Sequence, residues 1–463
     1  MAMNIWRSKH AGLSIVLCLS LMLPPLLCAQ SASHKGTVTC GETGRLLKDV
    51  YVRVIGKEVT ALTDANGAFE LFLGNSGTKT IIFDKPGFMV LEKRITSGTR
   101  SMDVKLRPRK ISAASFRWVK HIESKSAYGQ LTYKEDPAWQ ADFNQTSLEG
   151  DFASDSNMVR RDPSAIIKVG DLYYFYYTRG VRYAAGSDPK VFPWDQCDIW
   201  YATSKDGWKW EERGLAVKRG TAGSYDDRSV FTPEILAHQG KYYLVYQAVK
   251  SPYVDRVRNT IGMAIADSPS GPWIKLAEPI LRTTGNGEWL GEEDNRMALK
   301  KGDFDSHKVH DPCLVYYRDK FYLYYKGQRI GEHRFYGERE IKWGVAIADR
   351  PEGPYVKSAF NPITNTGHEV CVWPFEGGIA LLHTLDGPEA NTIQWAPDGI
   401  NFEIMSTVAN PPEAPGNYRS PSANKEPLEG IRWGLCHVYG GDNWRTGWNY
   451  IKRFDLVQKN QEE

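Results

Sequence analysis

The feature that most constrains this 463-residue chain is a strand–turn–strand pattern that recurs from residue 162 onward. Its copies read DPSAIIKVGDLYYFYY from 162, TPEILAHQGKYYLVYQ from 232, DPCLVYYRDKFYLYYK from 311 and EVCVWPFEGGIALLHT from 369. Each copy is followed by a second hairpin, such as TIGMAIADSPSGPWIK or KWGVAIADRPEGPYVK, and a fainter fifth set contains IRWGLCHVYGG and NYIKRFDL. Four strands in each of five successive sheets predict a five-bladed β-propeller over residues 158–463.

The predicted propeller brings the starts of distant strands together, because the innermost strand of every blade lines the central axis. Five titratable residues fall at or near such starts: Asp162, Glu234, Asp311, His368 and Glu369. An Asp-Pro pair alone usually marks a turn. Two such pairs at equivalent positions, 162–163 and 311–312, favour a shared functional site. Asp171 and Asp319 lie in the intervening turns and are expected to be structural.

Convergent acids of this kind suit glycoside hydrolysis. An inverting enzyme needs an acid for the leaving oxygen and a carboxylate that activates water on the opposite face, roughly 6.5–9.5 Å away. The walls of a propeller funnel provide such a gap. We assign Asp162 as the base, and Asp311 as a group that orients the sugar and tunes the pKa of the acid.

The first 29 residues are typical of an export signal. Arg7 and Lys9 precede an apolar run that ends in Leu27-Cys28-Ala29. The run is too short to span a bilayer and is interrupted by Pro24-Pro25, and no other long apolar segment follows. We therefore expect a periplasmic or extracellular protein without a membrane span. Lipidation of Cys28 is an alternative, although Leu27 occupies a place where such sites usually have a small residue.

Residues 30–109 form a unit of their own, with short alternating stretches separated by Gly and Asn turns that predict a small antiparallel β-sandwich. The stretch GTVTCGETGRLLKDVYVRV and the turn Thr63-Asp64-x-Asn66-Gly67 resemble the carboxypeptidase-regulatory-like module. A passive spacer is favoured over a carbohydrate-binding role, because the sequence shows no aromatic platform. Residues 110–157 are predicted as a helical linker, whose helix SAASFRWVKHIES begins at a Ser112 cap.

Charge and cysteine content exclude several classes of function. The 58 basic and 55 acidic residues are interspersed, so no nucleic-acid or membrane-surface footprint is visible and a neutral oligosaccharide is the expected partner. The five cysteines after the signal have no close pairs, and Cys313 and Cys371 are expected in the core. No cofactor is required. A hydrated metal ion on the axis is compatible with the sequence, but no residue cluster has metal-ligand spacing, so no metal ligand is assigned.

Residues 112–455 resemble glycoside hydrolase family 117, the α-1,3-(3,6-anhydro)-L-galactosidases that act on neoagaro-oligosaccharides in agar degradation. The resemblance rests on Ser112-x-Ala114-x-x-Arg117, Arg161-Asp162-Pro163-Ser164, Thr232-Pro233-Glu234, His310-Asp311-Pro312 and Gly367-His368-Glu369-Val370. It implies Asp162 as general base, Asp311 as pKa modulator and His368 as general acid, with Glu234 and Glu369 binding the sugar. Ser112, Ala114 and Arg117 then imply a homodimer that exchanges its linker helix. The N-terminal module is an addition to the family's usual plan.

A histidine acid needs nearby charge to keep its proton, because an isolated imidazole with a pKa near 6.5 is mostly deprotonated at neutral pH. Ionised Glu369 and Asp311 beside His368 would raise its pKa. His310 and His383 lie near the ends of inner strands and compete for the same role. Gln247 and Lys326, at the ends of inner hairpins, are weaker candidates for the pocket.

Two other functions remain open on the sequence alone. A family 43-type arabinofuranosidase or xylosidase would use three carboxylates, with Glu234 or Glu369 as the acid. A non-catalytic carbohydrate-binding propeller would bind sugar without turnover. The long segment 281–308 is expected to form a loop over the pocket, and such loops select the sugar that enters.

Overall fold

The computed structural model describes residues 32–457 apart from 56–59, 74–76, 86–87, 89–90, 97, 109–110, 124–134, 184–188, 332–340, 366, 376, 386, 421–424 and 444–446. The predicted export signal and Cys28 lie outside the described residues. The chain divides into two compact units: within the described residues the first extends to Leu106 without Phe88, and the second comprises Phe88 and the chain from Arg107 onward. Within the described part, none of the helices has the length and apolar character needed to cross a membrane.

The first unit consists of two sheets. In one, β1 (Ala32–Cys40) lies between β4 (Ala68–Leu73) and β7 (Ser101–Leu106); the other has the order β3 (Thr60–Leu62), β2 (Tyr51–Val54), β5 (Lys79–Asp84), β6 (Leu91–Ile95). Buried and exposed residues alternate along β4 and β7, so each presents one face to a core. The prediction of a purely antiparallel sandwich is wrong at one pair, because β1 and β7 are parallel. The chain passes through the other sheet between them, and a parallel pair requires such a long crossover.

The predicted turn of the first unit is present. The Asp64 Oδ1 atom accepts hydrogen bonds from the main-chain N–H groups of Asn66, at 2.8 Å, and Ala68, at 2.9 Å. Gly67 has φ 66°, a conformation that glycine adopts without strain. These contacts fix the connection from β3 to β4.

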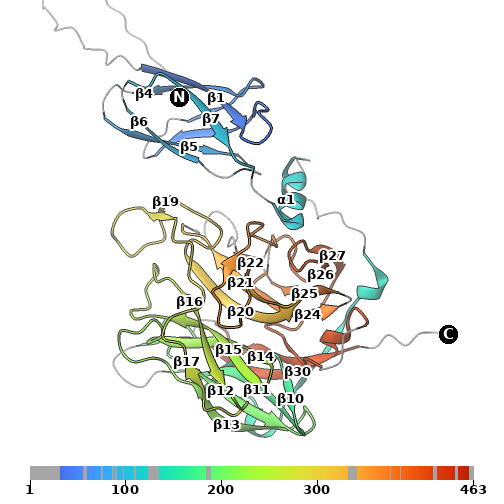
Figure 1. The fold of residues 1–463 in the computed structure, drawn as a ribbon. Coiled ribbons are helices and arrows are strands. Elements are labelled where there is room, and N and C mark those ends of the chain that lie inside the picture. The colour runs from blue at the N-terminus through green and yellow to red at the C-terminus, as the bar shows by residue number, and fades with distance from the viewer. Residues whose placement is uncertain are drawn as a thin grey trace, which may run out of the picture. The chain divides into compact units, whose positions relative to one another are not determined.

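The second unit follows the predicted repeat of four-stranded antiparallel sheets and is propeller-like (Figure 1). Sheet one contains β10 (Ile167–Val169), β11 (Leu172–Val181), β12 (Asp198–Ser204) and β13 (Trp210–Val217), with β9 (Met158–Arg161) also paired to β11. Sheet two contains β14 (Ser229–His238), β15 (Lys241–Val249), β16 (Thr260–Ala266) and β17 (Ile274–Lys275), and sheet three contains β20 (Lys308–Tyr317), β21 (Lys320–Gln328), β22 (Ile341–Ala348) and β23 (Val356–Lys357). Sheet four contains β24 (Glu369–Phe375), β25 (Gly378–Thr384), β26 (Thr392–Ala396) and β27 (Glu403–Thr407), and sheet five contains β28 (Gly416–Asn417), β29 (Trp433–Gly440), β30 (Trp448–Leu456) and β8 (Phe143–Ser147). The hairpins predicted from the sequence therefore correspond to strand pairs in every sheet. The described chain is all-β apart from the helix α1 (Ala113–Glu123) and the short 3-10 helices η1 (Pro137–Trp139), η2 (Gly150–Phe152) and η3 (Glu429–Ile431).

Sheet five is completed by a strand from the opposite end of the unit. β8 precedes sheet one in the chain, yet it pairs with β30 from Phe143↔Leu456 to Ser147↔Lys452. A parallel bridge between Ile166 and Tyr418 also links sheets one and five. The predicted helical linker at 110–157 thus carries a strand in addition to its helix. Its sequence FNQTS is largely polar and exposed, so it lacks the apolar alternation that marks a strand.

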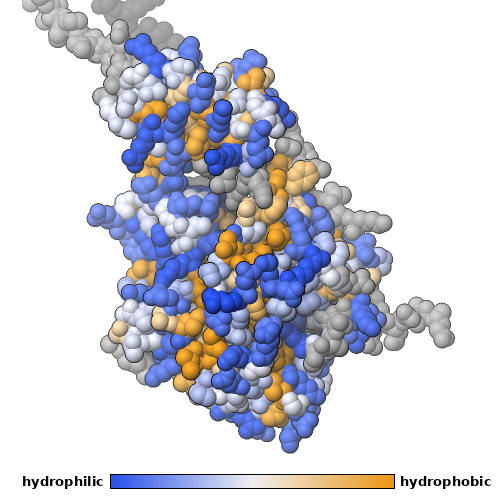
Figure 2. All heavy atoms as spheres, viewed as in Figure 1, coloured by the Kyte–Doolittle hydropathy of each residue, from blue (hydrophilic) through white to orange (hydrophobic). Residues whose placement is uncertain are grey.

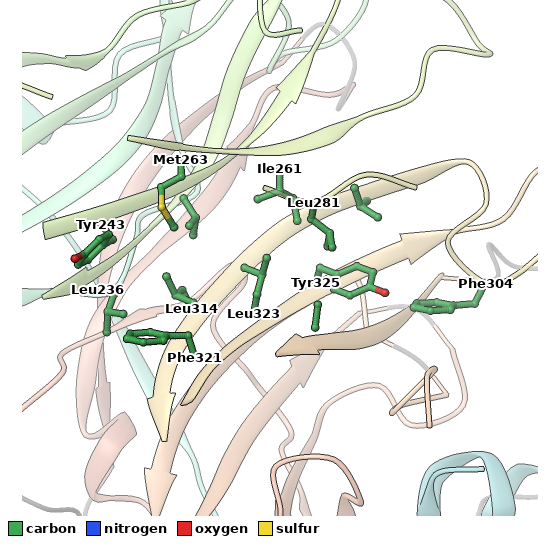
Figure 3. Packing of buried hydrophobic residues seen from close by; sticks show 13 residues of the cluster. Leu236, Tyr243, Ile261, Met263, Leu281, Phe304, Leu314, Phe321, Leu323 and Tyr325 are labelled. Carbon is green, nitrogen blue, oxygen red and sulfur yellow. The ribbon is translucent and has the colours of Figure 1, made fainter. Parts of the chain in front are cut away.

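Apolar side chains fill the space between adjacent sheets. Figure 3 shows one such cluster, in which Leu236, Tyr243 and Met263 of sheet two meet Leu314 and Leu323 of sheet three. An aromatic residue of a turn also packs between neighbouring sheets, since the Trp273 ring meets the Tyr176 ring of sheet one edge-on, with ring centroids 5.4 Å apart. The visible face in Figure 2 is mainly hydrophilic, with hydrophobic residues in smaller groups, as expected when the apolar strands pack against each other.

The helix α1 packs against sheet four of its own chain. Ser112 caps it as predicted: its hydroxyl accepts from the main-chain N–H of Ser115 at 3.1 Å and donates to the carbonyl of Pro362 at 2.6 Å. Ala114 is fully buried. The Arg117 guanidinium contacts the buried Glu389 carboxylate at 3.1 Å. The three residues predicted for dimerisation therefore anchor the helix within one chain here.

Candidate active site

Two adjoining cavities lie where the inner strands of the five sheets converge. The axial cavity, of about 420 Å³, is lined by residues of all five sheets, among them Asp162, Glu234, Cys371 and Asn417. The cleft, of about 710 Å³, is lined by Arg161, Phe192, Trp194, Phe231, Thr232, Gln247, Tyr253, Asn259, Arg296, Lys308, His310, Asp311, Lys326, Gln328, Ile341, His368 and Glu369. Thr232, Asp311 and Glu369 line both cavities.

A backbone irregularity recurs on the inner strands and explains why an aspartate leads two of the repeats. Asp162, Thr232, Asp311 and Ala414 each have a left-handed φ, between 47° and 52°, and each precedes a proline. Pairing shifts register at this place between β14 and β15 and between β20 and β21. Bulges of this kind redirect a side chain, and strained backbone often marks functional sites. All four residues line the axial cavity, so the bulge presents whichever side chain occupies it to the site.

Asp162 is held as an ionised carboxylate. The Arg161 Nε atom lies 2.9 Å from both carboxylate oxygens, and the Thr178 hydroxyl donates to Oδ2 at 3.0 Å. His437 Nδ1 lies 3.2 Å from Oδ1. Burial alone would raise the pKa of Asp162, but the Arg161 charge and the contact with His437 outweigh it and lower the pKa well below its usual range. A group that must accept a proton needs to be ionised in this way.

Asp311 has a different environment. It is paired with the Lys326 ammonium of the neighbouring strand β21, and both side chains are nearly buried. Burial raises the pKa of Asp311 and the charge of Glu369 adds to this effect, while Lys326 opposes it. Asp162 and Asp311 therefore occupy equivalent bulges with their pKa values displaced in opposite directions, an arrangement that separates acid and base roles in a site.

His368 and Glu369 form a pair at the start of β24. His368 Nδ1 lies 2.8 Å from Glu369 Oε1, and the His368 side chain is 20% exposed, so it can meet a ligand in the cleft. Burial raises the pKa of Glu369, and the Asp162 charge adds to this, with Lys326 and His437 opposing. The Glu369 carboxylate lies close enough to accept a hydrogen bond from a protonated His368, and the assignment of His368 as the acid stays a prediction.

The turn that carries His368 is held in place by Trp343 and packs closely against His383. The Trp343 Nε1 atom donates to the Gly367 carbonyl at 2.8 Å. Gly367 has φ 111°, and a Cβ there would lie 2.1 Å from His383 Nδ1. Only glycine therefore allows this close approach of the turn to His383.

The two competing histidines are poorly suited to donate a proton near neutral pH. Burial lowers the pKa of His383 to about 3, and His383 lines neither cavity. His310 does line the cleft, but burial and the Lys326 charge lower its pKa well below the usual value. Of the three candidates, His368 is the one with an adjacent carboxylate at hydrogen-bond distance and an exposed edge on the cleft.

The remaining predicted pocket residues also reach the cavities. Gln247 Nε2 lies 3.5 Å from His310 Nδ1 in the cleft, beside Lys326. Glu234 lines the axial cavity, where its carboxylate pairs with Arg419 and accepts from the main-chain N–H of Ala165 at 2.9 Å. Burial raises the pKa of Glu234. The assignment of these residues to sugar binding stays a prediction, and the contacts of Glu234 indicate a part in holding the inner strands.

Several site residues were not identified from the sequence. His437 lies on β29 of sheet five and Arg419 follows β28, where the repeat is faint, so no strand pattern pointed to the axis there. Arg419 donates to the carbonyl groups of Ile235 at 2.8 Å and Leu314 at 3.0 Å, and so ties three sheets together. Arg161 was visible beside Asp162 in the motif, but the contact of its Nε atom with both carboxylate oxygens was not predicted.

The segment 281–308 contributes to the cleft, as predicted. It carries a hairpin of its own, β18 (Glu288–Trp289) with β19 (Ala298–Lys300), and its residue Arg296 lines the cleft. The Arg296 guanidinium pairs with Asp255 at 2.7 Å, which anchors the segment to the connection between β15 and β16.

A directly ligated metal ion does not fit the described residues. No three His, Cys, Asp or Glu side chains within the described ranges are grouped closely enough to hold one. The acids of the site are paired instead with Arg161, Lys326 and Arg419. We therefore derive no step through a metal ion.

Comparisons with known proteins find relatives among the glycoside hydrolases. The model of glycosyl hydrolases family 43 matches residues 156–289, less than half of the chain. A solved family 117 glycoside hydrolase of the marine bacterium Zobellia galactanivorans is 35% identical, with 69% of this chain and 92% of that chain covered and a TM-score of 0.57. A β-xylosidase/α-arabinofuranosidase from a compost microbial metagenome is 16% identical, over 69% and 96% of the two chains, with a TM-score of 0.44. No curated protein matches.

The propeller-like fold, the convergent acids and the identity to a solved enzyme define a glycoside hydrolase. At 35% identity over nearly the whole length of that enzyme, the chain belongs to glycoside hydrolase family 117.

Proposed function

We propose that this enzyme is an exo-acting, inverting glycosidase that releases 3,6-anhydro-L-galactose, or a related sugar, from the non-reducing end of neoagaro-oligosaccharides. The observation that carries the proposal is the convergence of Asp162, Asp311, His368 and Glu369 from three sheets on two adjoining cavities. The ionised Asp162 contrasts there with two acids of raised pKa. The similarity to family 117 at Arg161-Asp162-Pro163, His310-Asp311-Pro312 and Gly367-His368-Glu369 supports the choice of substrate.

In the proposed reaction, Asp162 takes a proton from a water molecule, and the oxygen of that water attacks the anomeric carbon. His368 gives its proton to the leaving oxygen as the glycosidic bond breaks, and Glu369 favours the protonated imidazole beforehand. Asp311 and Lys326 orient the sugar and set the charge around the acid. Two groups with distinct protonation states are what single-displacement hydrolysis requires.

Incubation with neoagarobiose tests the proposal. We expect release of the anhydro sugar and galactose, with the anomeric configuration inverted in the first product seen by NMR. Retention of configuration, or no cleavage of neoagarobiose by the folded enzyme, would contradict it.

A family 43-type activity is the second candidate, because the family 43 model matches the segment that contains Asp162 and Glu234. Aryl arabinofuranoside and xyloside assayed beside neoagarobiose separate the two. Cleavage of the aryl pentosides alone would favour this candidate, with Glu369 or Glu234 as the acid.

The five sheets and the pairing of β8 with β30 support a ring of five blades closed by a strand from the N-terminal side of the unit. Closure of this kind places the two ends of the unit in one sheet, so hydrogen bonds between β8 and β30 hold the ring together. An experimental structure would count the blades directly.

A homodimer is a further part of the proposal. Ser112, Ala114 and Arg117 make contacts that a helix from a second chain would make equally well, as in exchange of an identical element between protomers. Light scattering is expected to give the mass of two chains. Arg117→Ala should shift the enzyme toward the mass of one chain, because the contact with Glu389 is lost. A single-chain mass for the unaltered enzyme would contradict the dimer.

A further inference from the structure

His437 is a buried histidine that the reaction described above does not use. It lies on β29 of sheet five and is 1% exposed. Its Nδ1 atom faces Asp162 and its Nε2 atom lies 3.4 Å from Glu413 Oε1. Glu413 is held to the same strand, since the main-chain N–H of His437 donates to the Glu413 carbonyl at 3.1 Å. The imidazole thus bridges the base of the site to a second carboxylate.

The contacts of Nδ1 depend on its protonation. Nδ1 lies 3.2 Å from the Asp162 carboxylate oxygen Oδ1 and also 3.2 Å from the main-chain nitrogen of Asp162. With a proton, Nδ1 donates to Oδ1. Without one, it accepts from the main-chain N–H, and its lone pair then faces the carboxylate oxygen, which is repulsive at this distance. Loss of the proton from Nδ1 therefore exchanges the partner of this nitrogen and releases one oxygen of the base.

Charged and titratable groups from several elements face this ring. Arg161 and Asp162 face it from sheet one, Glu369 from sheet four, Glu413 from the segment before β28 and Tyr439 from its own strand. Burial and the Arg161 charge would lower the pKa of His437, but the contacts with the Asp162 and Glu413 carboxylates outweigh them and raise it to about 9. The protonated contact is therefore complete below the ordinary value near 6.5 and is lost as the pH rises through about 9.

We propose that His437 is a positioning residue, which holds the Asp162 carboxylate in its working orientation only while the imidazole is protonated, and that Glu413 keeps it protonated. The role in turnover rests on the proposed function; the contact itself does not. The side chain of Glu413 is 24% exposed, so the buried pair of His437 and Asp162 reaches the solvent through this carboxylate. We therefore expect activity to fall at alkaline pH, because His437 loses its proton and no longer positions the general base Asp162.

Glu413→Gln is the variant that tests the proposal, because it removes one charge from a partly exposed position and keeps the side-chain shape. NMR titration of the imidazole signals follows His437, whose signal is assigned by its absence in His437→Gln. We expect the His437 midpoint to fall by at least about one pH unit in Glu413→Gln, as opposite charges at this range shift a pKa by 1–3 units. Glu426→Gln, a substitution of an exposed acid near sheet five, is the matched control and should leave the midpoint unchanged.

Activity supplies the second readout. The substrate for this assay is an aryl 3,6-anhydro-galactoside, whose leaving group departs without a proton. The fall of kcat at high pH, called the alkaline limb here, then no longer depends on His368. We expect this limb to move to lower pH in Glu413→Gln together with the NMR midpoint, while KM stays within about twofold. A purely structural histidine would change the yield or thermal stability without moving the limb.

Three results would overturn the proposal: a neutral His437 at pH 7 in the unaltered enzyme, an unchanged midpoint in Glu413→Gln, or a midpoint that moves while the limb does not. If the unaltered enzyme cleaves no glycoside, the proposed function fails by itself. The titration then decides the contact alone, since Asp162→Asn must also lower the His437 midpoint if the bridge exists.

Discussion

Replacement of Asp162 by asparagine is expected to lower kcat on neoagarobiose by about 10²–10⁴-fold, the range typical for loss of a general base. The amide keeps the shape of the side chain but cannot take a proton from water. KM should change little, because the sugar contacts assigned to Glu369, Gln247 and Lys326 remain. Steady-state kinetics at several substrate concentrations measure both quantities.

The control for this variant is Asp171→Asn, the same change in the exposed turn between β10 and β11. It should keep its activity, because Asp171 lines neither cavity. Asp162→Asn also leaves the buried Arg161 charge without its carboxylate, so thermal unfolding must confirm that the protein is folded at the assay temperature. A folded Asp162→Asn enzyme with nearly full kcat would exclude Asp162 as the base.

The second large effect is expected from His368→Gln. Hydrolysis of neoagarobiose should nearly disappear, with a loss of about 10²–10⁴-fold, because the galactose oxygen leaves slowly without a proton. An aryl glycoside with a good leaving group should be cleaved at close to the unaltered rate, since its departure needs no acid. The ratio of the two rates is therefore the quantity to measure.

His238→Gln serves as the control, because the His238 ring packs against Tyr316 and Phe321 and lines neither cavity. Its rate ratio should match that of the unaltered enzyme. An equal loss of both activities in His368→Gln would show that His368 supports the fold or binds the sugar instead of donating a proton. In that case Glu369, whose pKa is raised by burial, becomes the acid to test by the same comparison.

Much of the site could be predicted because its signals are local in the sequence. The alternation of apolar residues in stretches such as DPCLVYYRDKFYLYYK specifies strands, and repetition of the pattern specifies that equivalent positions meet at an axis. Asp162, Asp311, His368 and Glu369 line the cavities for this reason. The paired histidine and glutamate at 368–369 were adjacent in the chain, so their contact of 2.8 Å was also within reach of sequence reasoning.

Contacts between distant segments gave no such signal. The polar strand β8 is a strand only because β30 offers it a partner, and the parallel pair of β1 with β7 depends on a crossover through another sheet. The identity of the residues behind the acids was equally hidden. Arg419 pairs with Glu234, which lies 185 positions earlier in the chain. A single arginine or histidine carries no periodicity that could reveal such a contact.

The sequence by itself determined that this protein is built from repeated antiparallel sheets with acids at the inner ends of their strands. Only the tertiary structure decided the protonation of those acids, because a pKa depends on burial and on charges a few ångströms away. Asp162 and Asp311 occupy the same place in the same repeat, yet Arg161 and His437 hold one ionised while burial favours the neutral form of the other. Local pattern specifies where a side chain lies along a strand, and the packing of distant strands specifies what surrounds it.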